Sequence, residues 1–187
     1  YFAMRWPERA LSITLAGIGS GSASADRARF QQEAVASADT LLRDGWAKSA
    51  RARATTATRV QLLNKSPRAF EEFVGHLSEH SALGSAMTLK GYQALRPSLA
   101  DFAAQAGACT VPTLIISGDE DEPCLDASLM LKRMMPSAGL LFLPQTGHAC
   151  NLEEPDLFNA ACERFFHQVE SGQYRLRDPR ARGGPMI

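Results

Sequence analysis

The sequence has no excess of charge of either sign, because 20 lysine and arginine residues balance 20 aspartate and glutamate residues. Proteins that bind nucleic acid or acidic ligands through bulk electrostatics carry a strong imbalance, so the composition does not indicate such a partner. The chain also lacks an apolar run of the roughly 20 residues that a membrane helix needs. Its longest run lies around residues 10–19. We therefore expect no nucleic-acid partner and no membrane span.

Cysteine spacings typical of metal sites are also absent. The four cysteines form no Cys-x-x-Cys motif. They are Cys109, Cys124, Cys150 and Cys162. In a chain of this size, free and partly buried thiols of a reducing compartment are the favoured interpretation. No secretory signal is visible either, and we expect a cytoplasmic protein.

The first 25 residues are expected to form a small piece of an α/β core. Tyr1–Trp6 is apolar enough for the end of a helix, and Pro7 begins the turn that stops it. Leu11–Ala16 is a short run with β-branched residues, which predicts a strand. The glycine- and serine-rich segment Gly17–Ser22 predicts a flexible loop after that strand.

Residues 26–109 have a different character, with many alanines, many charges and few β-branched runs. Ser66 followed by Pro67 is a typical helix start, and apolar residues follow it at helical spacing. These residues are Phe70, Phe73, Val74 and Leu77. We expect three to five helices here and no strand.

Residues 110–170 alternate between short apolar runs and amphipathic segments. Val111–Ser117 and Gly139–Leu143 predict buried strands, and Asp126–Met135 and Leu152–Val169 predict helices. Strand, helix, strand and helix joined by short links imply parallel strands with right-handed crossovers. The tail over residues 171–187 is rich in arginine, glycine and proline, so we expect it to be loose or to be an arm on a partner.

Ionisable residues follow both of these strands. Asp121 lies in the loop after the first strand, and His148 lies in the loop after the second. Ligands of open parallel sheets bind outside the carboxyl ends of the strands, so a carboxylate from one loop can reach an imidazole from the other. An aspartate bonded to one ring nitrogen fixes the histidine tautomer and leaves the other nitrogen to act as a base. The neighbouring Asp119, Glu120 and Glu122 are interpreted as surface charges.

The two loops resemble the acid and histidine segments of α/β-hydrolases. The first segment reads Gly118-Asp119-Glu120-Asp121 followed by Pro123, and the second reads Gly147-His148. In that family the acid is the third residue after the glycine, which maps to Asp121 and not to Asp119. The resemblance implies the C-terminal part of a mainly parallel α/β-hydrolase sheet, with residues 26–109 as a helical lid insertion. If the loops meet, Cys124 and Cys150 become neighbours, and a disulfide between them stays open as an alternative.

The sequence departs from that family at the nucleophile. The family's nucleophile lies on a Gly-x-Ser-x-Gly elbow between a strand and a helix, and this pentapeptide is absent. The segment Gly17–Gly21 has glycine at its centre, and Ser20 follows the wrong strand. By resemblance, Tyr1–Arg9 corresponds to the helix directly after the elbow. We therefore expect an N-terminal segment or chain to carry the nucleophile, the oxyanion hole and the first five strands.

The absence of the nucleophile strand from this sequence is expected to affect the stability of the chain. The strand at Leu11–Ala16 would expose an apolar edge where the nucleophile strand should pair. We expect the fragment alone to be neither independently soluble nor active, and its first partner to be the N-terminal polypeptide. A homo-oligomer is also compatible with the sequence.

Two further patterns bear on cofactors. His76 and His80 are four residues apart, a spacing that can hold zinc, but no His-Glu-x-x-His motif and no third ligand accompany them. The loop over residues 17–22 follows a strand and precedes a helix, as phosphate sites do, yet it matches neither GxGxxG nor GxxxxGK[ST]. We expect no metal and no organic cofactor, and a nucleotide-binding module is a minor alternative.

The expected function is hydrolysis of an ester or a related small acyl substrate through a nucleophile–histidine–aspartate triad. Asp121 and His148 supply the acid and the base, and the nucleophile lies outside the sequence. With an aspartate nucleophile the same loops would serve an epoxide hydrolase or a dehalogenase, and with serine they could also serve carbon–carbon bond cleavage. A hydrolase-like binding protein without catalysis is the remaining alternative.

Overall fold

Three short apolar segments form one parallel sheet in the computed structural model, which describes residues 1–22 and 25–183. The strands are β1 (Ile13–Ala16), β2 (Thr113–Gly118) and β3 (Ala138–Leu143). They pair in the order β1-β2-β3, with Ile115 of β2 opposite Leu15 and Leu140. The parallel sheet predicted from the alternation of strands and helices is confirmed.

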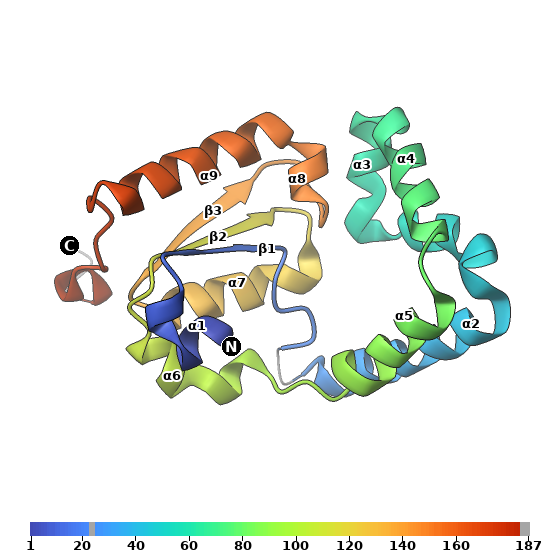
Figure 1. Ribbon diagram of the computed structural model, residues 1–187, viewed down its shortest axis with the longest axis horizontal. Coiled ribbons are helices and arrows are strands. Elements are labelled where there is room, and N and C mark those ends of the chain that lie inside the picture. Colours follow the sequence, from blue (N-terminus) through green and yellow to red (C-terminus); the bar gives the residue numbers. More distant parts are fainter. Residues whose placement is uncertain (23–24, 184–187) are drawn as a thin grey trace.

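Helices cover both faces of this sheet and complete the sheet lobe (Figure 1). They are α1 (Phe2–Arg5), α6 (Ala103–Ala108), α7 (Glu122–Met134), α8 (Cys150–Glu153) and α9 (Pro155–Glu170). Side chains alternate between the two faces along β2. On one face, Ile115 belongs to a core that also contains residues of three helices, Ala3, Ala106 and Leu131. On the other face, Ile116 belongs to a second core, and Phe158 of α9 packs against it.

The second lobe, here called the helical lobe, is built from residues 27–93. Its elements are α2 (Arg27–Ala54), η2 (Ala57–Arg59), α3 (Val60–Lys65), α4 (Pro67–Ser78), α5 (Ala82–Thr88) and η3 (Leu89–Gln93). Helix α2 kinks at Gly45, where φ is 70°, and the side chains of Leu41 and Trp46 form a core with Ala86. Ser66 caps α4 by accepting a hydrogen bond from Ala69 N, as expected for a Ser-Pro helix start. Across the described residues, no helix has the length and apolar character to cross a membrane.

Two helix boundaries differ from the prediction. Helix α7 begins at Glu122, before the expected Asp126, because Pro123 fits the first turn, where no backbone N–H is needed. The single helix expected over Leu152–Val169 is interrupted. Helix α8 ends at Glu153 and α9 begins at Pro155, since a proline ring cannot continue a preceding helix.

The last part of the expected helical insertion over residues 26–109 packs on the sheet lobe. Helix α6 falls within residues 26–109, but its Ala106 belongs to the core of the sheet lobe and packs near α7. The short η4 (Leu99–Phe102) leads into it. The division of the chain into a core, a lid over 26–109 and a tail remains a prediction.

The glycine-rich loop after β1 is held by several hydrogen bonds in its described residues, and its flexibility remains a prediction. Ser22 N donates to Gly19 O at 2.9 Å within the loop. From a distant part of the chain, Arg96 donates to Ser20 O, and Ser98 Oγ donates to Ser22 O at 2.7 Å. Residues 23–24 of the expected 1–25 segment lie outside the described residues.

The tail contacts the sheet lobe through Tyr174 and Arg177, and the prediction that it is loose or an arm on a partner remains a prediction. Tyr174 Oη donates to Thr113 O at 2.8 Å, and its ring packs edge-on against Phe165. Arg177 N donates to Pro136 O at 2.8 Å before the 3-10 turn η5 (Pro179–Arg182). Composition alone missed these contacts because they depend on one tyrosine and on backbone groups. Residues 184–187 lie outside the described residues.

Candidate active site

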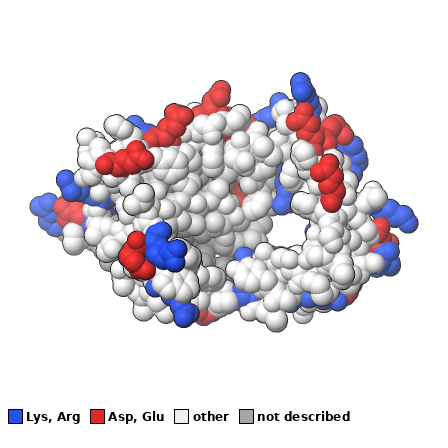
Figure 2. All heavy atoms as spheres, viewed as in Figure 1, with Lys and Arg blue, Asp and Glu red and all other residues white. Residues whose placement is uncertain are grey.

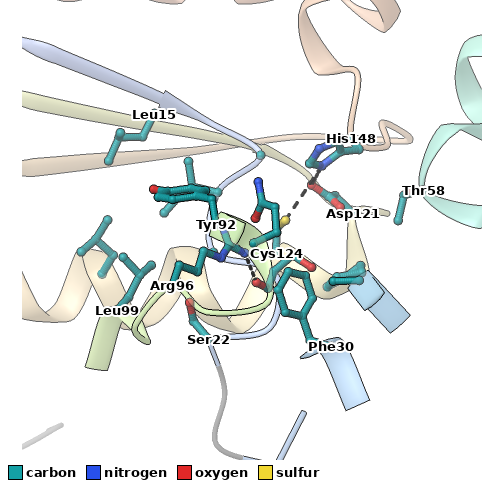
Figure 3. A pocket seen from close by; sticks show the side chains of 18 of the residues that line it. Leu15, Ser22, Phe30, Thr58, Tyr92, Arg96, Leu99, Asp121, Cys124 and His148 are labelled. Carbon is teal, nitrogen blue, oxygen red and sulfur yellow. Dashed lines mark hydrogen bonds and ion pairs between the residues drawn. The ribbon is translucent and has the colours of Figure 1, made fainter. Parts of the chain in front are cut away.

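The two loops singled out in the sequence meet at the carboxyl edge of the sheet. Asp121 follows β2 and forms the N-cap position of α7, and His148 follows β3 and precedes α8. Because neighbouring parallel strands end at one edge, their loops converge there. His148 Nδ1 lies 2.8 Å from Asp121 Oδ2 (Figure 3). The predicted pairing of carboxylate and imidazole in space is confirmed.

The two partners of this pair differ in exposure. The side chain of Asp121 is 1% exposed, whereas that of His148 is 34% exposed and lines a pocket. A buried carboxylate that contacts Nδ1 favours the tautomer with a proton on that nitrogen, and it stabilises a protonated ring. The other ring nitrogen, Nε2, is then the one that can accept a proton. This is the arrangement that base catalysis by histidine needs.

The histidine loop is clamped through its backbone. The buried carboxylate of Glu153 accepts hydrogen bonds from Gly147 N at 2.5 Å and from Ala149 N at 3.1 Å. His148 N donates to Thr58 O at 2.6 Å, so the helical lobe contributes the third contact. Together these bonds fix the backbone on both sides of the imidazole. Sequence reasoning missed Glu153, although an acid just after the histidine in a short helix was a usable signal.

Replacing Glu153 with glutamine is expected to lower the free energy of unfolding by about 1–3 kcal/mol. An amide has only one accepting oxygen, so its NH₂ group would face a backbone N–H that needs an acceptor. Thermal or urea unfolding of the complete protein measures the change. Glu163→Gln, at an exposed position of α9, is the matched control. Equal stability of the two variants would show that the clamp contributes nothing.

Gly17, the first residue after β1, completes the site from the third strand. Its N–H donates to Ile116 O at 3.0 Å, and its φ of +56° lies in the left-handed region that favours glycine. A Cβ here would lie 3.0 Å from His148 Nδ1 and 3.3 Å from Asp121 Oδ2. The close approach of this backbone to His148 and Asp121 therefore also requires glycine. In the sequence, Gly17 stands directly after a predicted strand, and we interpreted that glycine only as a sign of a flexible loop.

The acidic residues beside Asp121 are exposed, as expected for surface charges, but two of them join segments. Asp119 Oδ1 accepts from Thr146 N at 3.1 Å and so connects the acid loop to the histidine loop. Glu120 accepts from Gln61 of the helical lobe at 2.6 Å. The first contact holds together the two loops that carry Asp121 and His148.

Cys124 lies directly behind the pair. Its Sγ is 3.9 Å from His148 Nδ1, and with Asp121 these residues form a cluster whose potential ligand atoms lie within 4.8 Å of one another. Burial and the Asp121 charge raise the pKa of the Cys124 thiol to about 12, so the thiolate that a metal or a nucleophilic role requires is disfavoured. The Nδ1 atom is also engaged with Asp121. The cluster therefore fits a metal poorly.

In the described residues, the remaining cysteines and histidines form no bond with the side chains of the pair. All four cysteines are free, so no disulfide joins Cys124 and Cys150. His76 lies 3.6 Å from Glu79, and His80 packs edge-on against Trp46 in the helical lobe.

A pocket of about 840 Å³ opens beside His148, between the sheet lobe and the helical lobe. Figure 2 shows the surface hollowed there, with acidic and basic side chains mixed on the visible face. Apolar residues from both lobes line the pocket, among them Leu15, Phe30 and Leu99 (Figure 3). A volume of this size is typical of small-molecule sites. Within the described residues, the side-chain partners of the imidazole are Asp121 and Cys124, and no hydroxyl is bonded to it.

Known proteins resemble the chain in sequence and in structure. No family model matches it. A protein of Klebsiella pneumoniae subsp. pneumoniae, named "Putative carbamate hydrolase RutD", is 41% identical over 78 residues, which are 41% of this chain and 28% of that protein. A Bacillus subtilis protein, named "Putative 2-succinyl-6-hydroxy-2,4-cyclohexadiene-1-carboxylate synthase", is 26% identical over 175 residues, or 90% of this chain and 61% of that protein.

Among solved structures, a malate-bound thermophilic esterase from Thermogutta terrifontis matches with a TM-score of 0.74 and 20% identity. The match covers 90% of this chain and 60% of the esterase chain. At this identity the likeness establishes a shared fold. The chain spans less than two thirds of the length of each of these relatives.

Proposed function

We propose that this chain, which has the α/β-hydrolase fold of its structural relatives, supplies the base and the orienting acid of a hydrolase for small acyl substrates. The observation that carries the proposal is the 2.8 Å contact between His148 Nδ1 and the buried Asp121, at the wall of a pocket large enough for a small molecule. The name of the Klebsiella relative, a carbamate hydrolase, and that of the Thermogutta esterase support acyl transfer to water.

In the proposed reaction, a serine hydroxyl attacks the carbonyl carbon of the substrate and gives its proton to His148 Nε2. His148 then donates that proton to the leaving group, and water repeats the sequence to release the acid. Asp121 holds the ring and stabilises the imidazolium that forms in each half-reaction. No metal or organic cofactor takes part in these steps.

We propose that the serine belongs to residues outside this sequence, in an N-terminal segment or a separate chain. The absence of Gly-x-Ser-x-Gly from the sequence supports this, as does the position of β1 at the sheet edge. In the same proposal the helical lobe acts as a lid over the pocket, because its residues line one wall. We also propose a cytoplasmic location, which the four free thiols support.

The name of the Bacillus relative, a carboxylate synthase, favours a second candidate. In it the same Asp121–His148 pair moves a proton during a synthase reaction rather than a hydrolysis. Turnover of simple esters by the complete protein separates the two, because the second candidate does not require it.

Incubation of the complete protein with a fluorophosphonate probe is expected to give covalent capture detectable by mass spectrometry. The serine oxygen bonds to phosphorus, fluoride leaves, and His148 takes the serine proton. Heat-denatured protein should not react, because capture needs the assembled site. Intact protein that neither reacts with the probe nor hydrolyses an ester would contradict the proposal and favour a binding protein. Turnover of epoxides without capture would instead indicate an aspartate nucleophile.

A further inference from the structure

Two arginines of the helical lobe line the same pocket as His148. Arg53 lies in the last turn of α2, and Arg59 ends η2. Both side chains are half-buried. In the part of the chain that the structure describes, neither forms an ion pair with a carboxylate. By contrast, two other arginines of α2 form solvent-exposed ion pairs: Arg43 pairs with Asp44, and Arg51 pairs with Glu71.

The two guanidinium groups are held by neutral contacts. Arg53 donates to Ser37 O at 3.2 Å and lies over the Trp46 ring at 5.4 Å. Arg59 donates to Thr56 Oγ1 at 3.3 Å and lies over the Phe73 ring at 6.0 Å. These contacts fix the direction of each side chain without neutralising its charge.

The electrostatic surroundings add a cost to this arrangement. Burial lowers the pKa of Arg53, and the like charge of Arg59 lowers it further. Burial also lowers the pKa of Arg59, and the charge of Asp121 opposes that shift. Arginine stays cationic near neutral pH because its pKa begins above about 12. Two like charges of the helical lobe thus face a pocket that Glu33 and Arg96 also line, and the nearby carboxylate of Asp121 is already bonded to His148.

We propose that Arg53 and Arg59 form a carboxylate-binding subsite, and that the substrates are acyl compounds bearing a second, anionic carboxylate away from the reacting carbonyl. This inference rests on the proposed function and deepens it. Guanidinium groups bind carboxylates through paired, charge-assisted hydrogen bonds. A singly charged carboxylate suits the site better than a phosphate, because Asp121 already places negative charge near Arg59.

The first test compares two esters of equal length on the complete protein, p-nitrophenyl hemiglutarate, which carries a free carboxylate, and neutral p-nitrophenyl valerate. The ratio of their kcat/KM values should favour the anionic ester. In Arg53→Gln and in Arg59→Gln that ratio should fall roughly 10- to 100-fold, mainly through a higher KM for the anionic ester. Arg51→Gln, two residues from Arg53 but paired with Glu71 in solvent, is the matched control and should leave the ratio unchanged.

The second test measures binding without turnover. Calorimetric titration of the complete His148→Ala protein with glutarate should show binding that Arg53→Gln or Arg59→Gln removes and that Arg53→Lys partly restores. Inorganic phosphate that binds more tightly than glutarate would overturn the carboxylate assignment. Equal hydrolysis of both esters with no glutarate binding would overturn the subsite and leave the proposed function standing. Glutarate binding without any ester hydrolysis would instead contradict the proposed function alone.

Discussion

Replacing His148 with alanine in the complete protein is expected to lower kcat for a small ester by about 10⁴- to 10⁶-fold. In the proposed mechanism, the variant has no group to take the proton of the nucleophile or to return it to the leaving group. The imidazole is held by Asp121 and by the backbone contacts of Gly147, Ala149 and its own N–H, so no other histidine can replace it. A steady-state assay with a chromogenic ester measures the loss.

The control for this substitution is His167→Ala, at an exposed position of α9. This substitution removes an imidazole from the exposed surface of α9, and it should leave kcat unchanged. Circular dichroism checks that both variants fold. An unaltered rate for His148→Ala would remove the base from the proposed mechanism.

Replacing Asp121 with asparagine is expected to lower kcat roughly 10⁴-fold while the fold is retained. The asparagine amide would present a donor to Nδ1, which favours the tautomer with the proton on Nε2. That nitrogen could then no longer accept a proton from the nucleophile. The loss should appear in kcat more than in KM, because Asp121 in the proposed mechanism acts on the imidazole rather than on the substrate.

Asp119→Asn separates the two candidate acids of the loop. Asp119 accepts a bond from Thr146 N through one oxygen, and asparagine keeps that acceptor. We therefore expect Asp119→Asn to retain most of the activity. A larger loss in Asp119→Asn than in Asp121→Asn would reverse the assignment of the acid.

The contact between Asp121 and His148 could be predicted because it follows from local patterns. Two apolar runs, Thr113–Gly118 and Ala138–Leu143, are separated by a helix, and parallel strands joined in this way end at one edge. The loops after the two strands could then be brought together without knowing any other contact, and the resemblance to α/β-hydrolases selected Asp121 rather than Asp119 within the first loop. The helical character of residues 27–93 was visible for a similar reason, since alanine content and apolar spacing act over short distances.

Other parts of the site could not be predicted because they depend on contacts between distant residues. Gly17 lies against the imidazole only once β1 pairs with β2. The packing of the loop after it depends on Arg96 and Ser98, which no local pattern connects to it. Arg53 and Arg59 look like other arginines of an alanine-rich helical segment, and only the folded chain shows that their charges face the pocket.

The bond from His148 N to the carbonyl of Thr58 joins the proposed base to the helical lobe through backbone atoms alone. Any side chain can therefore stand at position 58 without breaking it, whereas adding or deleting a residue in the turn between α2 and α3 would move the carbonyl. Engineering at position 58 is thus free in residue type and restricted in loop length. Libraries that randomise position 58 at constant length should yield far more active members than libraries that vary the length of the turn.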